Sequence, residues 1–234
     1  MFRDIKERHL SKKTTLITFI NPLAAWLAGK HPDYVDLLTA FDFVLCDGIG
    51  VVVAAKILDG IELPRISFDG TSIAPRLFEW ALELKQKVFL VGGRPGVAER
   101  ARSAIMIRFP GLNVSTHHGY FPSMGDVISK IKESGAPFVI CGLGAPLQER
   151  FLLELSASGW KGSAFTCGGY LDQISLDYDY YPRWINSLNL RFAYRLYREP
   201  RRLATRYLLQ YSRFSSQVAL ELLRNRLKTR PSRQ

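Results

Sequence analysis

The sequence predicts an α/β protein in which helices cover both faces of a Rossmann-like, mostly parallel sheet, followed by a basic helical C-terminal appendage. Two observations predict the sheet. Short apolar runs alternate with segments of helical length, and several strands pass into a helix through glycine and a polar residue. The crowding of basic residues near the end of the chain predicts the appendage. We therefore assign residues 1–182 to an α/β domain and residues 183–234 to the appendage.

The elements follow from the apolar runs and the breaks between them. Strands are expected at residues 14–20, 41–46, 87–91, 112–116, 138–141 and 163–166, the second of them short and buried. Helices are expected at residues 23–29, 49–58, 73–85, 97–109 and 126–133, and from the corner at 142–149 to about residue 156. Residues 1–13 are charged and predict a mobile arm or a short helix. Ligands of such sheets bind at the edge where the strands end.

The net charge of +11 belongs to the end of the chain. Residues 183–234 contain thirteen of the 32 basic residues, twelve of them arginine, but only two of the 21 acidic residues. This asymmetry indicates an anionic partner: a membrane surface, a nucleic acid or a phosphorylated ligand. The preference for arginine favours phosphate, because the guanidinium group binds phosphate oxygens in pairs.

Composition predicts a protein of a reducing compartment with an ample core. Apolar residues make up 47% of the chain, and the three cysteines, Cys46, Cys141 and Cys167, lie in apolar runs as expected of buried thiols. The longest apolar run, residues 16–28, is too short to span a membrane and contains a proline. Acidic residues at Asp4 and Glu7 argue against a signal peptide.

Asp47 is the residue around which the functional interpretation is built. It stands where the second expected strand passes into a helix, so it is either a general base beside a ligand or the N-cap of that helix. This stretch alone favours the cap. Asn21 occupies the equivalent place after the first strand, where an N-cap role would explain it. Arg65 and Asp69 lie in an irregular polar stretch and could form a loop ion pair.

Three further corners combine glycine with polar residues. Gly92-Gly93-Arg94 leads from a strand into a helix, which is suited to cradling a phosphate with backbone N–H groups and one cation. At the next corner Gly142 and Gly144 precede Gln148, whose side chain could hydrogen-bond a sugar or base, and Glu149, which complements the helix dipole. The last strand ends at Gly168-Gly169. The adjacent His117 and His118 have no third ligand at metal-binding spacing, so no metal site is expected.

The appendage contains a stripe of arginines at helical spacing. They are Arg191, Arg195, Arg198, Arg202 and Arg206, and an apolar stripe of Phe192, Leu196, Leu203 and Tyr207 runs beside them. Pro200 predicts two helices that meet at Glu199-Pro200. A basic amphipathic helix is typical of a membrane-surface element or of a lid over an anionic ligand, although a solvated charged face is the simpler alternative.

Taken in order, these motifs resemble the WecG/TagA/CpsF glycosyltransferases, family 26, from about residue 14 to about residue 214. The segments that carry the resemblance are Thr18–Pro22, Asp47–Val52, Arg65, Val91–Gly96, His118–Phe121, Gly142–Glu149, Gly168–Gly169, Pro182–Trp184 and Tyr194–Arg202. The resemblance implies an inverting hexosyltransferase that needs neither a metal nor another cofactor. Such enzymes move a sugar from a UDP-sugar to a saccharide on polyprenyl diphosphate, in the synthesis of bacterial cell-surface polysaccharides.

The resemblance also implies roles for particular residues. Asp47 is expected to be the general base, and the arginines of the appendage, 191, 195, 198, 202 and 206, to close over the diphosphate and to contact the anionic inner face of the plasma membrane. Substrate binding is expected of Asn21, Arg65, Gly92, Gly93, Arg94, Gly142, Gly144, Gln148, Gly168 and Gly169. The protein is then cytoplasmic and peripheral on that membrane, without a nucleic-acid partner, and homo-oligomer formation stays open.

Two departures from the family pattern leave the donor sugar open. Where the family has Arg-Val-x-Gly-x-Asp, this chain has Arg65-Ile66-Ser67-Phe68-Asp69-Gly70, and where the family has Gly-Gly-Ala-Phe-Asp, it has Gly168-Gly169-Tyr170-Leu171-Asp172. The donor is therefore UDP-N-acetylmannosamine, its uronic acid or UDP-glucose. Two other classes stay as alternatives: a nucleotide- or nucleic-acid-binding module, supported by the basic tail, and an NAD-dependent oxidoreductase, supported by the glycine corners.

Overall fold

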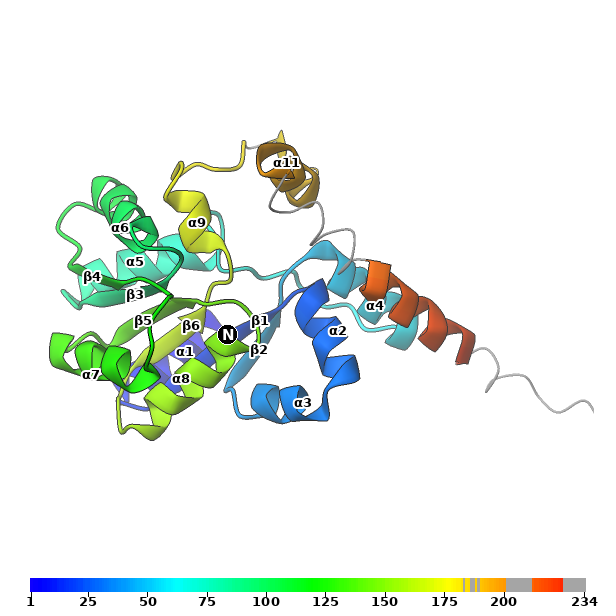
Figure 1. Cartoon of the computed structure of the whole chain (residues 1–234), viewed down its shortest axis with the longest axis horizontal. Helices are drawn as coiled ribbons and strands as arrows, with labels where there is room; N and C mark the ends of the chain where they lie inside the picture. Colours follow the sequence, from blue (N-terminus) through cyan, green and yellow to red (C-terminus); the bar gives the residue numbers. More distant parts are fainter. Residues whose placement is uncertain (183, 186–187, 189, 201–211, 225–234) are drawn as a thin grey trace, which may run out of the picture. The chain divides into compact units, whose positions relative to one another are not determined.

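The computed structural model describes residues 1–182, 184–185, 188, 190–200 and 212–224 (Figure 1). Backbone contacts group the chain into two compact units. The first unit contains residues 1–19, 36–45 and 67–180, and the second contains residues 20–35, 46–66 and 181–234. The second unit thus combines the end of the chain with the segments that follow the first two strands. The predicted boundary between residues 182 and 183 stays a prediction.

A six-stranded sheet organises the chain. Its strands are β1 (Thr15–Ile20), β2 (Phe43–Cys46), β3 (Val88–Gly92), β4 (Val114–His117), β5 (Phe138–Gly142) and β6 (Ser163–Thr166), in the order β2-β1-β6-β5-β3-β4. The β1–β6, β6–β5, β5–β3 and β3–β4 pairs are parallel. This confirms the predicted sheet. The expectation that β2 is buried is wrong, because β2 lies at the edge of the sheet and exposes Val44.

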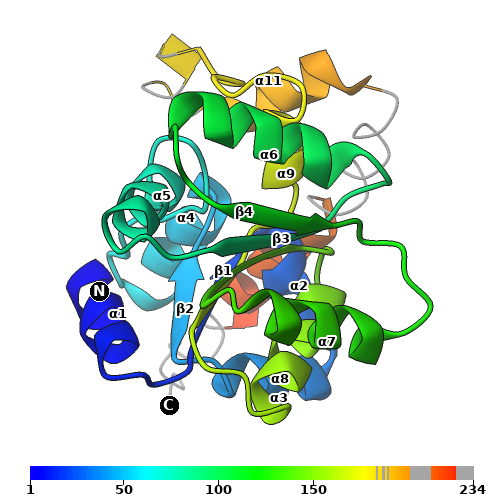
Figure 2. The same ribbon diagram turned by 90° about the vertical axis from the view of Figure 1, so that its left-hand side faces the viewer.

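Helices of the first unit cover both faces of the sheet. They are α1 (Phe2–Leu10), α5 (Ile73–Glu83), α6 (Val97–Arg108), α7 (Met124–Ser134), α8 (Leu147–Ala157) and α9 (Tyr170–Ile174). Figures 1 and 2 show α5, α6 and α9 on one face and α7 and α8 on the other. On the latter face, apolar side chains of α7 and α8 form a buried core with alternate residues of β3 and β5, among them Phe89, Val91 and Val139.

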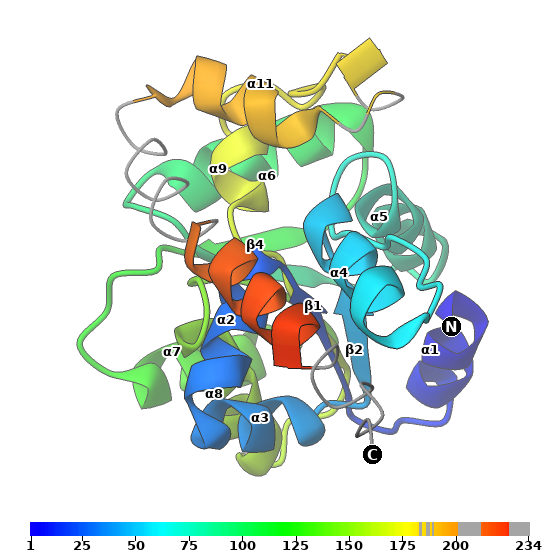
Figure 3. The same cartoon turned by 90° about the vertical axis from the view of Figure 1, so that its right-hand side faces the viewer.

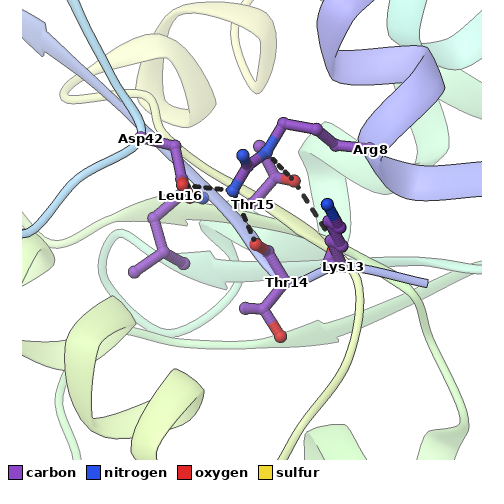
Figure 4. A network of polar contacts seen from close by, with 6 residues as sticks. All are labelled: Arg8, Lys13, Thr14, Thr15, Leu16 and Asp42. Carbon is purple, nitrogen blue, oxygen red and sulfur yellow. Dashed lines mark hydrogen bonds and ion pairs between the residues drawn. The ribbon is translucent and has the colours of Figure 1, made fainter. Parts of the chain in front are cut away.

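Polar contacts fix α1 against the start of the sheet. The guanidinium group of Arg8 pairs with Asp42 and donates to the carbonyl oxygen of Thr14 over 3.4 Å, and the other oxygen of Asp42 accepts from Leu16 N at 2.8 Å (Figure 4). The His9 ring stacks on Phe138 with 4.3 Å between centroids. The charged beginning of the chain is therefore a short helix rather than a mobile arm, and Asp42 serves to join it to β1.

The second unit contains α2 (Pro22–Lys30), α4 (Ile49–Asp59), α11 (Arg191–Arg198) and a helix over residues 212–224. The last of these packs beside α2 and α4 (Figure 3). A Cβ on Gly50 of α4 would lie 3.6 Å from Pro22 and 3.8 Å from Phe214, and one on Gly29 of α2 would overlap the side-chain amide of Gln217. Small residues therefore let the three helices approach closely.

Two helices were not expected from the sequence. One is α3 (Pro32–Thr39), and the other is α9, which has only five residues. In the part of the chain that the structure describes, no helix combines the length and the apolar character needed to cross a membrane.

Candidate functional site

The connections that leave β3 and β5 run toward opposite edges of the sheet. From β3 the chain passes through α6 to β4 on one side, and from β5 it passes through α8 to β6 on the other. Ligands of open α/β sheets bind at such a switch point, outside the carboxyl ends of the strands. Gly92 and Gly142, the last residues of the two strands, are paired in register. The topology thus makes the predicted glycine corners the first candidate for a ligand site.

Backbone packs directly on backbone at these corners. A Cβ on Gly92 would lie 2.5 Å from the carbonyl oxygen of Gly142, and a Cβ on Gly142 would lie 2.9 Å from that of Gly168. At Gly144 and Gly168, in contrast, a Cβ would meet nothing within 4 Å, and the backbone has positive φ angles of 81° and 53°. The first two glycines are therefore required by close packing, and the other two by left-handed backbone that faces open space.

The corner at Gly93-Arg94 has the features of an anion site. It leads into the 12-residue helix α6, whose N-cap is Gly96 and receives no side-chain hydrogen bond, and Arg94 is exposed beside it. The amide of Gly119, in the loop after β4, donates to the carbonyl oxygen of Gly93 at 2.8 Å. The N–H groups of a helix terminus, the helix dipole and one cation together favour a phosphate.

Gln148 lies behind the corners and takes part in an internal network. Its side chain is 4% exposed; Oε1 accepts from the Gly168 amide at 3.3 Å, and Nε2 donates to Glu149 Oε1 at 2.9 Å. The amide group therefore holds the β6 corner in place. The expected contact between Gln148 and a sugar or base stays a prediction, as do the substrate contacts of Gly142, Gly144, Gly168 and Gly169.

Glu149 was expected only to complement the helix dipole, but it is the buried centre of a hydrogen-bond network. Its side chain is fully buried, and Oε1 accepts from Thr18 Oγ1 at 3.1 Å. The hydroxyl of Thr18 is also 2.9 Å from that of Thr166, which acts as donor in this pair because Thr18 donates to the carboxylate. One signal was present: Thr18 is the one polar residue between Leu16 and Ile20 of β1.

In the second unit, Asn21 and Asp47 have different roles. Asn21 caps α2, because its side chain accepts from Ala24 N at 3.0 Å. The N-cap of α4 is Gly48, with φ of 99° and no side-chain cap hydrogen bond, so the cap interpretation of Asp47 is wrong. The Asp47 amide donates to the carbonyl oxygen of Ile20 at 2.8 Å, which joins the ends of β1 and β2. Half-buried Asp47 thus stands at the end of β2, one residue before the N-cap of α4.

The backbone brings Arg65 to the corner that holds Asp47. The amide of Ile66 donates to the carbonyl oxygen of Cys46 at 2.9 Å. Asp47 follows Cys46 and Arg65 precedes Ile66, so this hydrogen bond brings the backbones of Asp47 and Arg65 close together. A candidate base and a candidate cation for a leaving group therefore lie at one corner of the second unit.

Two arginines of α11 enclose a pair of tyrosines. Tyr181 and Tyr194 have ring centroids 6.0 Å apart, the Arg191 guanidinium lies 5.3 Å from the Tyr181 ring, and Arg198 donates to the Tyr194 hydroxyl at 3.1 Å. Arg195 is half-buried, and α11 ends at Arg198, just before the expected break. Arg202 and Arg206 lie outside the described residues.

The sequence was compared with known proteins. The model of the glycosyl transferase WecG/TagA/CpsF family matches residues 1–228. The chain belongs to this family. It is therefore a glycosyltransferase, and the oxidoreductase and binding-module alternatives are set aside.

Two relatives of this chain are named for the transfer of different sugars. One is the UDP-Gal:alpha-D-GlcNAc-diphosphoundecaprenol beta-1,4-galactosyltransferase of Shigella boydii. It is 32% identical to this chain, and the match covers 86% of this chain and 84% of the relative. Another, from Bacillus subtilis, is 30% identical over 85% of this chain and 78% of its own. It is an N-acetylglucosaminyldiphosphoundecaprenol N-acetyl-beta-D-mannosaminyltransferase.

The two places where this transferase departs from the family pattern meet in its structure. Phe68 stands where the pattern has glycine, and Tyr170 stands where it has alanine. Both side chains are buried, and their rings pack edge to face with 5.4 Å between centroids. Tyr170 begins α9, directly after the Gly168-Gly169 corner. The two residues that depart from the pattern thus contact each other beneath that corner.

His117 of this transferase contacts neighbouring protein groups, and two of its three cysteines are buried. The His117 ring contacts the carbonyl oxygen of His118 at 2.8 Å and the Lys130 amine at 3.3 Å, as ordinary polar residues do. Across the described residues, no group of three His, Cys, Asp or Glu side chains could hold a metal ion. Burial raises the pKa of the Cys141 and Cys167 thiols. Cys46 is only half-buried, contrary to expectation, because edge strand β2 carries it.

Proposed function

We propose that this glycosyltransferase moves a sugar from a UDP-sugar to N-acetylglucosamine carried on a polyprenyl diphosphate, in the synthesis of a bacterial cell-surface polysaccharide. The names of the two relatives support this acceptor. They specify different sugars to be transferred, galactose and N-acetylmannosamine, but the same N-acetylglucosaminyl-diphosphoundecaprenol. An acceptor common to relatives with different donors is the part of the reaction most easily carried over to this chain.

In the proposed reaction Asp47 is the general base. Its carboxylate accepts the proton of the acceptor hydroxyl, whose oxygen forms a bond to C1 of the sugar. The bond between C1 and the diphosphate oxygen breaks, and its electron pair leaves with UDP. Both relatives form β-linkages, which is the outcome expected when the acceptor attacks an α-linked UDP-sugar from the opposite face. The observation that carries this role is that Asp47 follows the end of β2 directly, at the corner that Arg65 adjoins.

The charge of the leaving diphosphate is assigned to cations and a helix terminus. Arg65 shares the corner of Asp47, while Arg94 and the start of α6 adjoin the switch point of the sheet. Arg191, Arg195 and Arg198 lie in the same unit as Asp47, and Arg202 and Arg206 continue the pattern in the sequence. Groups of this kind stabilise charge that develops on a leaving group. In this proposal they do so without a metal ion.

The proposed reaction takes place at the surface of the membrane, on its cytoplasmic face. A polyprenyl diphosphate keeps its hydrocarbon chain in the bilayer, so a transferase without a membrane span in its described part must reach the lipid head group from the surface. The donor stays among UDP-N-acetylmannosamine, its uronic acid and UDP-glucose, and the Shigella relative adds UDP-galactose as a fourth sugar to test.

A donor screen tests the proposal. The purified full-length protein is mixed with each UDP-sugar and a short-chain polyprenyl diphosphate N-acetylglucosamine, and mass spectrometry follows both the acceptor and the released UDP. We expect one donor to add a single sugar to the acceptor. The matched control is the same lipid diphosphate without its sugar, which should stay unmodified. If none of the donors extends the N-acetylglucosamine lipid, the proposed acceptor is wrong.

A further inference from the structure

Helix α4 exposes an apolar stripe. Ile49, Val53 and Ile57 follow one another at intervals of four residues, so they lie on one side of the helix, and they are 39%, 46% and 54% exposed. A surface helix of a globular protein normally places polar side chains on such a face. After the helix, Ile61 and Leu63 continue the run of exposed aliphatic side chains.

The inner side of α4 is already occupied. Gly50 faces Pro22 of α2 and Phe214 of the helix over residues 212–224, and Ala54 is buried. Small residues therefore make these helix–helix contacts, while the large aliphatic side chains of Ile49, Val53 and Ile57 stay exposed. The exposed stripe is therefore not part of the protein core, and its exposure needs a separate explanation.

Other helices of the same unit expose large apolar side chains as well. Phe192, Leu196 and Tyr197 are exposed on α11, and Leu220 and Leu223 are exposed on the helix over residues 212–224. Apolar side chains that gather on the surface in this way mark an interaction site. On α11 they alternate with Arg191, Arg195 and Arg198, so apolar contact and positive charge come from one short helix.

Charge identifies the partner. The second unit holds 16 of the 32 basic residues but only six of the 21 acidic ones, whereas the first unit holds 16 and 15. The second unit therefore carries almost the whole net charge of the protein. An anionic lipid bilayer attracts the cations and accepts the aliphatic side chains. A nucleic acid would use the charge but not the aliphatic stripe, and a second copy of this unit would bring no negative charge to match the cations.

We propose that the α4 stripe is a membrane-inserting surface, on which Ile49, Val53 and Ile57 enter the interface of an anionic bilayer while α11 supplies electrostatic attraction. The inference deepens the proposed function. Because Asp47 lies two residues before α4, insertion of the helix holds the base at the level of the lipid-linked acceptor.

Vesicle binding of the full-length protein tests the stripe. The variant Val53→Asn/Ile57→Asn is compared with the wild type by co-sedimentation with vesicles of phosphatidylethanolamine and phosphatidylglycerol. Loss of two inserted aliphatic side chains should weaken binding by about tenfold or more. The matched control is Met106→Asn/Ile107→Asn on α6, which removes two exposed aliphatic side chains from the first unit and should bind as the wild type does.

A second measurement reports insertion directly. In the variant Val53→Trp, lipids brominated on their acyl chains should quench additional fluorescence relative to the wild type. Equal vesicle binding of wild type and Val53→Asn/Ile57→Asn, or no additional quenching at Trp in position 53, would overturn the inference. Neither experiment contains donor or acceptor, so its result is independent of the donor screen that tests the proposed function.

The basic residues of α11 provide the electrostatic comparison. Arg191→Gln/Arg198→Gln should weaken binding at low salt by about tenfold, and high salt should remove its difference from the wild type. The weaker binding of Val53→Asn/Ile57→Asn should persist at high salt, because apolar insertion is not screened. If salt abolishes both differences, α4 contributes no insertion and the inference fails.

Discussion

Phe68 and Tyr170 form an edge-to-face aromatic pair, with ring centroids 5.4 Å apart and an angle of 75° between the rings. Both side chains are buried, at 5% and 2% exposure, although their positions carry glycine and alanine in the family pattern. Phe68 also packs against Phe165 of β6, and Tyr170 opens α9. The pair therefore ties the polar loop before α5 to the strand and helix that flank the Gly168 corner.

This pairing predicts coupled effects on stability. Phe68→Ala and Tyr170→Ala should each lower the free energy of unfolding by about 3 kcal/mol, because each leaves a cavity in the core. The double variant should lose about 1 kcal/mol less than the sum, since the aromatic contact is lost only once. Urea unfolding of the four proteins measures the coupling, and strictly additive losses would show that the two rings stabilise the corner independently.

The buried Glu149 carboxylate should be required for folding stability. Glu149→Ala removes the acceptor of Thr18 and Gln148 and should lower the free energy of unfolding by about 3 kcal/mol. Glu154→Ala is the matched control, because Glu154 is an exposed carboxylate on the same helix and should change stability by less than about 0.5 kcal/mol. Equal losses in the two variants, measured in urea, would contradict the assigned network.

Gly92 should not tolerate a side chain. In Gly92→Ala the new Cβ would overlap the Gly142 backbone, so the ends of β3 and β5 must separate, and we expect a loss of at least about 3 kcal/mol. Gly135→Ala is the comparison: Gly135 also has a positive φ but faces open space, so the expected loss is about 1 kcal/mol. Thermal unfolding of the purified variants distinguishes close packing from backbone strain alone.

Turnover should depend on the Asp47 carboxylate. Asp47→Asn keeps the size of the side chain but removes the base, so the rate of transfer should fall at least about a hundredfold while the fold and donor binding persist. Asp59→Asn removes an exposed carboxylate from the other end of α4 and should leave the rate unchanged. Single-turnover measurements with saturating substrates provide the comparison. A near wild-type rate for Asp47→Asn would exclude the assigned role.

His9 should make stability depend on pH. Burial lowers the pKa of His9, with the hydrogen bond to Gln86 acting in the opposite direction. Below about pH 6.5, His9 of the unfolded chain therefore binds a proton while His9 of the folded protein is still neutral. The contribution of neutral His9 is complete above that pH and is lost as the pH falls toward the folded-state pKa. Urea midpoints between about pH 7.5 and 5.5 should drop less in His9→Gln than in the wild type.

A histidine control isolates this effect. His31→Gln removes an exposed imidazole from the second unit, and the difference between the two variants gives the pH dependence that belongs to His9. Identical pH dependence in wild type and His9→Gln would show that the buried contacts of His9 with Ser163 and Gln86 do not govern its protonation.

Local patterns were sufficient to predict most elements but not their surroundings. Short, mostly uncharged runs between turn residues predicted all six strands, because the strands of a parallel sheet are largely buried. The same run at residues 41–46 wrongly suggested a buried strand, since nothing in four residues specifies a place at the sheet edge. The five-residue helix α9 was missed because one turn and a half has too little periodicity to recognise.

The candidate site shows the same division. The N-cap role considered for Asn21 is confirmed, because a cap requires only contacts within four residues, while its expected substrate contact stays a prediction. For Asp47 the structure decides only that Gly48 is the N-cap of α4, so its catalytic role stays a prediction, and the buried contact of Glu149 depends on Thr18, which is 131 residues away. Interactions over such separations leave no local pattern, and only an isolated polar residue in an apolar strand hints at them.

By itself, the sequence determined the family, the alternation of strands and helices, and the concentration of positive charge at the end of the chain, because motif order, periodicity and charge are properties of neighbouring residues. The tertiary structure decided that Phe68 packs on Tyr170, that Arg65 joins the corner of Asp47, and that α4 turns its aliphatic residues outward. These relationships depend on which surfaces are buried when distant segments meet, and burial is settled only by the complete fold.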